Sequence, residues 1–103
     1  MDYLRAIEKE IEKRQPDESS GLDTWDRAEL EYLQDIRNQL RGGASPQAVC
    51  ERLQADLPQL EEQVAAEEAC YTFDWYDDHY YEKIYSGQLK ACRIALELYE
   101  KSR

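Results

Sequence analysis

The residues of this chain best suited to chemistry are carboxylates that lie close together in the sequence. Between Arg52 and Lys83 there is no Lys or Arg, whereas nine acidic residues occur: Asp56, Glu61, Glu62, Glu67, Glu68, Asp74, Asp77, Asp78 and Glu82. Asp74, Asp78 and Glu82 are four residues apart, a spacing at which like charges destabilise a helix by a few tenths of a kcal/mol per pair. The stretch therefore predicts either a solvated acidic face or an electronegative surface that binds a basic partner.

The same stretch is rich in aromatic residues. Seven of the fifteen residues from 71 to 85 are Tyr, Phe or Trp. Trp75, Tyr81 and Tyr85 fall beside the apolar stripe expected for this region, and Tyr and Trp are enriched in protein interfaces. The predicted partner-binding residues are Glu61, Glu62, Glu67, Glu68, Asp74, Trp75, Asp77, Asp78, Tyr81, Glu82 and Tyr85.

Catalytic and metal-binding motifs are missing from the sequence. His79 is the only histidine, and its neighbours Asp77 and Asp78 diverge from it by about 100° each on a helix, so the three do not converge on one ion. Gly42-Gly43 lacks the Lys-Ser/Thr that follows a phosphate-binding loop. We predict no enzyme activity, no cofactor and no metal, and an enzyme or metal protein that uses His79 with carboxylates stays as the third hypothesis.

Three cysteines, Cys50, Cys70 and Cys92, match neither a CxxC pair nor a zinc-ligand spacing. We expect reduced and mostly buried thiols. Because the N-terminus has no apolar stretch of signal-peptide length and no run of apolar residues could cross a membrane, we expect a soluble cytoplasmic protein.

Helical periodicity extends over most of the chain and places these residues. Residues 2–14 carry Leu4, Ile7 and Ile11 on one stripe, and a second helix over 23–41, capped by Asp23, ends at Gly42-Gly43. Its predicted apolar positions are Leu22, Trp25, Leu33, Ile36 and Leu40.

Ser45-Pro46 is a helix-start signal for a short third helix to about Asp56. Pro58 is then expected to open a fourth segment, and a break near residues 72–74 to precede a last helix over about 74–101. Its stripe contains Phe73, Tyr76, Tyr80, Ile84, Gly87, Ala91, Ala95 and Leu98. Gly87 predicts a close helix–helix contact, with a kink or break as the alternatives. The fold class is all-α: one domain over 1–103, a compact bundle of four to five helices with short turns.

The net charge restricts the partners. The 103 residues have 23 Asp and Glu against 13 Lys and Arg, a formal charge of −10. Direct binding of nucleic acid or of an anionic membrane is therefore excluded as a main activity, since both rest on Lys and Arg. Residues 46–86 contribute −8 of that charge. The net charge also argues against a DNA-binding helix-turn-helix over residues 46–68. All charged residues between Gln59 and Glu68 are acidic, and phosphate would repel them.

In size, charge and helical content alone, the chain resembles small acidic proteins that neutralise nucleic-acid-handling enzymes, such as anti-CRISPR-like and other phage-encoded anti-defence inhibitors and nuclease immunity proteins. The resemblance implies a nucleic-acid mimic whose carboxylates, about 6 Å apart per four residues of helix, stand in for phosphates. The first hypothesis is thus an inhibitor or regulator that covers a basic surface of a partner protein, such as a nuclease. The second is a helical adaptor or homodimer that buries Trp75, Tyr81 and Tyr85.

Overall fold

A computed structural model describes residues 2–14, 24–69 and 80–102. Within these ranges it contains four helices: α1 (Tyr3–Lys13), α2 (Thr24–Arg41), α3 (Pro46–Ala69) and α4 (Tyr80–Ser102). No strand occurs in the same ranges, so the predicted all-α bundle is confirmed.

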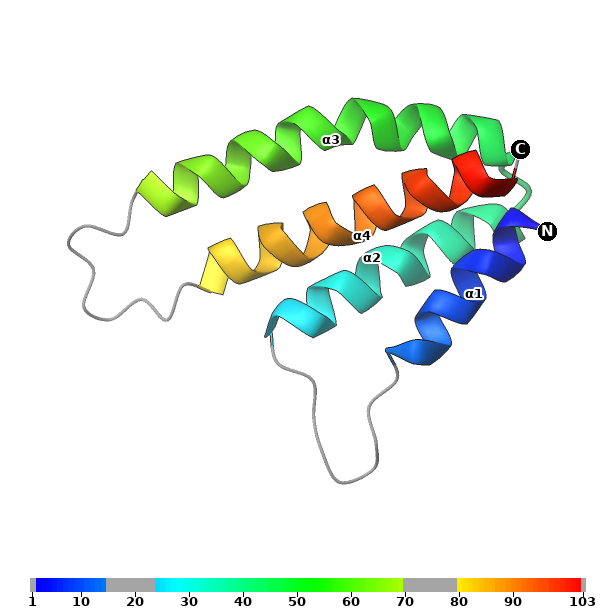
Figure 1. Ribbon diagram of the computed structural model, residues 1–103, viewed down its shortest axis with the longest axis horizontal. Coiled ribbons are helices and arrows are strands. Elements are labelled where there is room, and N and C mark those ends of the chain that lie inside the picture. The colour runs from blue at the N-terminus through cyan, green and yellow to red at the C-terminus, as the bar shows by residue number, and fades with distance from the viewer. Residues whose placement is uncertain (1, 15–23, 70–79, 103) are drawn as a thin grey trace, which may run out of the picture.

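Helix α4 is the centre of the bundle. It packs against α3 on one side and α2 on the other, and α1 contacts both α2 and α4 (Figure 1). The helix that comes last in the sequence is therefore surrounded by the other three. The end of α3 and the start of α4 lie at the same end of the bundle, and both chain termini lie at the other end (Figure 1).

Short polar signals fix the helix ends, as the sequence predicts at Ser45 and Gly43. The Ser45 hydroxyl accepts a hydrogen bond from the Ala48 amide at 3.1 Å, and Pro46 is the first residue of α3. Gly43 ends α2 with a φ of 109°, a left-handed conformation that glycine adopts without strain. Asp2 caps α1 by accepting a hydrogen bond from the Leu4 amide at 3.2 Å.

The predicted interruption at Pro58 is wrong, because α3 is continuous from Pro46 to Ala69. Proline removes the amide that would bond to the carbonyl of Gln54, but Gln54 and Pro58 both lie on the solvent side of α3, where water can satisfy that carbonyl. On the opposite side Leu53 and Leu60 are buried before and after the proline. Their packing keeps one helix, which arches over α4 in Figure 1.

Most of the predicted core positions are confirmed. Ile7 and Ile11 of α1, Leu33 and Ile36 of α2, and Ala91 and Ala95 of α4 are buried in one cluster. The cluster also contains Val49, Leu53 and Leu60 of α3. Cys50 and Cys92 are buried thiols outside any disulfide, as expected, and Cys70 lies outside the described residues.

Trp25 corrects the predicted stripe of α2: its side chain is 45% exposed instead of buried. Trp25 lines the open groove beside α4, close to Gly87, where α2 and α4 cross. A Cβ atom on Gly87 would meet the Trp25 carbonyl oxygen at 2.5 Å and the Ala28 Cβ at 3.1 Å. The backbones are therefore in contact there, as Gly87 predicts.

Several sequence predictions fall on residues that the structure does not describe. These are the Asp23 cap, the break near 72–74, and the first residues of the predicted helix over 74–101. Described α4 starts at Tyr80 and ends at Ser102, one residue beyond the predicted end.

Candidate protein-binding surface

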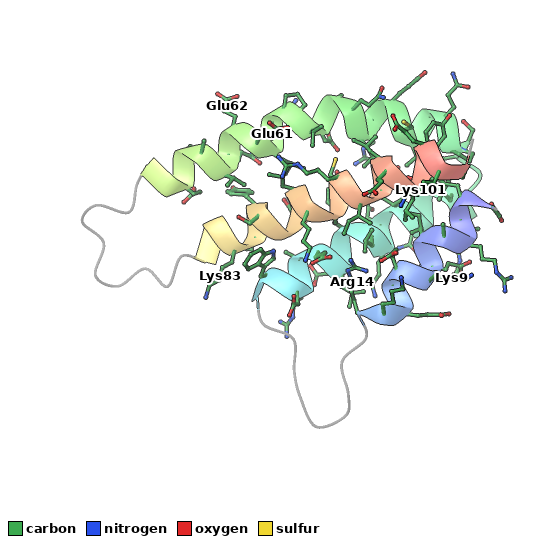
Figure 2. All side chains as sticks on the ribbon, in the orientation of Figure 1. Lys9, Arg14, Glu61, Glu62, Lys83 and Lys101 are labelled. Carbon is green, nitrogen blue, oxygen red and sulfur yellow. The ribbon has the colours of Figure 1, made fainter. Side chains whose placement is uncertain are left out.

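The acidic surface predicted from sequence is represented on α3 by Glu61 and Glu62. Both side chains are exposed, and Figure 2 shows Glu62 projecting away from the bundle. Among the described residues neither forms an ion pair with a Lys or Arg. Two adjacent carboxylates are thus available to a cation outside this chain.

The remaining predicted binding residues divide into three groups. Glu67 on α3 and Tyr85 on α4 are half-buried, so each presents only part of its side chain to solvent. For Glu68, Tyr81 and Glu82 the structure gives the helix, α3 or α4, but not the side chain. Asp74, Trp75, Asp77, Asp78 and His79 lie outside the described residues.

The fold brings the two helical parts of the predicted surface to one end of the molecule. Glu61, Glu62 and Glu67 lie in the second half of α3, and Tyr85 lies in the first half of α4. Those two halves pack side by side because α3 and α4 are antiparallel neighbours (Figure 1). The helix halves that carry these carboxylates and Tyr85 are therefore adjacent at one end of the bundle.

A second group of charges, which periodicity did not reveal, surrounds one buried carboxylate between three helices. Glu29 of α2 is only 3% exposed, and Arg14 donates to it through Nε at 2.5 Å. Lys90 of α4 places its Nζ 3.8 Å from the other Glu29 carboxylate oxygen. Arg14, labelled in Figure 2, also donates to Glu10 of α1 at 2.7 Å, and the network joins α1, α2 and α4.

The electrostatics of this network favour the charged forms. Burial works to raise the pKa of Glu10, but hydrogen bonds from Arg14 and Lys13 outweigh it, and the net pKa lies below its ordinary value. Burial likewise opposes the charge on Arg14, and its two carboxylate partners raise its pKa overall. The only sequence signal for this role was Glu29 itself, an acid directly between Ala28 and Leu30 on the buried side of α2.

A third polar cluster lies where α2, α3 and α4 meet. The Tyr32 hydroxyl donates to Asp56 at 3.4 Å, and the Cys92 thiol donates to the Leu53 carbonyl at 3.4 Å. Tyr32 and Asp56 line a cavity of about 180 Å³ together with Gln59, Leu60, Gln63 and Gln88. Burial raises the pKa of Tyr32 above its ordinary value, so its hydroxyl stays protonated and acts as a donor.

This cluster does not supply an activated nucleophile. Burial raises the pKa of the Cys92 thiol, a hydrogen bond from Tyr32 opposes that rise, and the charge of Asp56 adds to it. A thiol with a raised pKa carries little thiolate near neutral pH, and the thiolate is the reactive form. Within the described ranges no three His, Cys, Asp or Glu side chains are grouped so as to hold a metal ion.

None of the helices in the described part of the chain is both long enough and apolar enough to cross a lipid bilayer.

Comparison with known proteins gives no relative: no protein-family model, no curated protein and no solved structure matches this chain.

Proposed function

We propose that this protein acts by binding another protein, as an inhibitor or regulator that covers a basic, nucleic-acid-binding surface of its partner. The observation that supports this most directly is the exposed pair Glu61 and Glu62, in a stretch without Lys or Arg between Arg52 and Lys83. Surface acids in a folded domain are ordinarily interspersed with bases, which add stability at helix spacing. An uncompensated acidic face instead attracts and steers a basic partner.

The proposed surface extends from the second half of α3 to the first half of α4. On the adjacent half of α4, Tyr85 presents part of its aromatic side chain to solvent, and Tyr together with carboxylates suits stacking and pairing with Arg side chains. Anti-defence inhibitors and nuclease immunity proteins are the kinds of protein that use such a surface. The proposal includes neither a catalytic residue nor a cofactor.

The test is affinity capture from the native cell, or from its host if the gene is mobile, with three versions of the full chain as bait. One bait is unchanged, one carries Glu61→Gln and Glu62→Gln, and the control carries Glu12→Gln and Glu31→Gln, two exposed acids on α1 and α2. Both double variants lose the same charge, so only position differs between them.

We expect one basic protein to be retained by the unchanged and control baits and lost from the Glu61/Glu62 bait. Its retention should fall steeply between about 50 and 200 mM salt, as binding to phosphates does. Added nucleic acid should compete for it. Equal retention on all three baits, or retention insensitive to salt, would show that this surface is not the binding site.

A further inference from the structure

The outer face of α4 carries a charge pattern that the proposed function does not use. At alternating steps of three and four residues it presents Lys83, Ser86, Lys90, Arg93, Glu97 and Glu100, here called the α4 stripe. Its last four members are exposed. Figure 2 shows α4 between α2 and α3, with Lys83 near its start and Lys101 near its end.

The order of charges in the α4 stripe is opposite to what a single helix favours. Carboxylates stabilise the beginning of a helix and bases its end, because of the helix dipole. Here the bases Lys90 and Arg93 come first, and the acids Glu97 and Glu100 follow toward the end at Ser102. Only Glu97 is compensated within the helix, by Lys101 at 3.2 Å. Stability of the isolated helix therefore does not explain the pattern.

An antiparallel copy of the same helix does explain it. When two such helices pair in the usual heptad register, Arg93 faces Glu97 of the partner subunit and Lys90 faces Glu100 of the partner subunit. Two-fold symmetry repeats both pairs, so the contact contains four pairs of opposite charge. A parallel copy would instead set like charges against each other.

Apolar surface accompanies these charges. A groove of about 420 Å³ along α4 is lined by Trp25, Val64, Leu89 and Ile94, and Lys90, Arg93 and Glu97 line it too. Trp25 is the exposed large hydrophobic residue of the described chain. An apolar strip flanked by complementary charges is the composition of a protein interface.

We infer that the α4 stripe and its groove form the interface of a homodimer, with α4 antiparallel to α4 of the second copy. Glu61 and Glu62, the exposed carboxylates of α3, do not line this groove, so the proposed dimer does not use them. Because each copy has a net charge of −10, the dimer forms against overall repulsion, which is screened beyond about 8 Å at physiological salt.

The experiment is sedimentation equilibrium of the full chain at about 0.15 M salt, over concentrations from about 1 μM to 1 mM. Arg93→Glu makes positions 93 and 97 both acidic, and Glu97→Arg makes both basic. Two of the four pairs then become repulsive, while the Lys90–Glu100 pairs are unchanged, so each variant should associate more weakly with its own copy. We expect each to weaken dimerisation at least about tenfold relative to the unchanged protein. Arg5→Glu and Glu12→Arg are the charge-matched controls on α1 and should dimerise as the unchanged protein does.

A mixture of the two charge-reversal variants gives the most specific test of the pairing. In an equimolar mixture of the Arg93→Glu and Glu97→Arg proteins, every acidic position faces a basic one, so a heterodimer should form. Circular dichroism checks that each variant is folded, and the neutral variants Arg93→Gln and Glu97→Gln replace any reversal that is not. The inference is overturned by an unchanged protein that stays monomeric throughout, by variants that dimerise undiminished, or by folded variants whose mixture stays monomeric.

Discussion

Glu29 and Glu62 are the same residue type in opposite surroundings. Glu29 is 3% exposed and has Arg14 and Lys90 beside it, whereas Glu62 is exposed and has no ion-pair partner among the described residues. A buried carboxylate without partners would be strongly destabilising, so the fold recruits bases from two other helices to it. At Glu62 water takes that role, and the carboxylate stays available to a partner.

Burial and ion pairing thus divide the 23 acidic residues of the chain into two kinds: those that stabilise the fold and those that are available for binding. An acid whose charge is satisfied inside the protein contributes to how α1, α2 and α4 are held together. An acid whose charge is satisfied only by solvent contributes to the surface potential. Variants of the first kind should therefore change stability, and variants of the second kind should change binding.

The largest effect is expected from Arg14→Met. This change removes the 2.5 Å contact and leaves Glu29 buried with only the 3.8 Å contact to Lys90. Removing one partner of a buried ion pair typically costs about 3–5 kcal/mol, and we expect the lower end because Arg14 is partly exposed. Urea unfolding followed by circular dichroism measures the loss.

Lys90→Met is the matched control for Arg14→Met. The Lys90 side chain is 57% exposed and its contact to Glu29 is longer, so its loss should cost less than about 1 kcal/mol. The control is measured at low protein concentration, where a dimer does not contribute. Equal losses for the two variants would mean that Glu29 is not held chiefly by Arg14.

Gly87→Ala should have the next largest effect. Its new Cβ atom would lie 2.5 Å from the Trp25 carbonyl oxygen, which is backbone and cannot rotate away. Helices α2 and α4 must separate, and the same separation admits water beside Glu29, the residue that follows Ala28. We expect a loss of about 1–3 kcal/mol in thermal or urea unfolding.

A control for Gly87→Ala is Ser86→Ala, one residue earlier on the rim of the groove. The substitution adds no atom, so it should leave the stability within about 0.5 kcal/mol. A Gly87→Ala protein as stable as the original would contradict the close crossing of α2 and α4.

The sequence predicts the helices better than it predicts the contacts between helices. Ser45-Pro46, Gly43 and Gly87 are local signals whose meaning depends on a few neighbouring atoms, and each has the predicted role. Pro58 is local too, yet its expected helix break does not occur. Burial of Leu53 and Leu60 against α4 outweighs the single lost hydrogen bond, and that packing is not visible in one segment.

The charge network is the clearest case of what sequence patterns cannot supply. Arg14 and Glu29 are fifteen residues apart, and Lys90 is far from both, so no spacing rule connects them. Exposure is likewise a property of the whole fold, and it selected Glu61 and Glu62 from a longer list of predicted acids. The other members of that list with described side chains, Glu67 and Tyr85, are half-buried.

The smallest effect on stability is expected where the largest effect on binding is proposed. Glu61→Gln with Glu62→Gln keeps the shape of both side chains, removes two charges from solvent and breaks no ion pair of the described chain. Urea unfolding should give a stability within about 0.5 kcal/mol of the original. A loss of stability as large as that of Arg14→Met would show that Glu61 and Glu62 stabilise the fold as Glu29 does. It would contradict the proposal that these two acids form a binding surface for a partner.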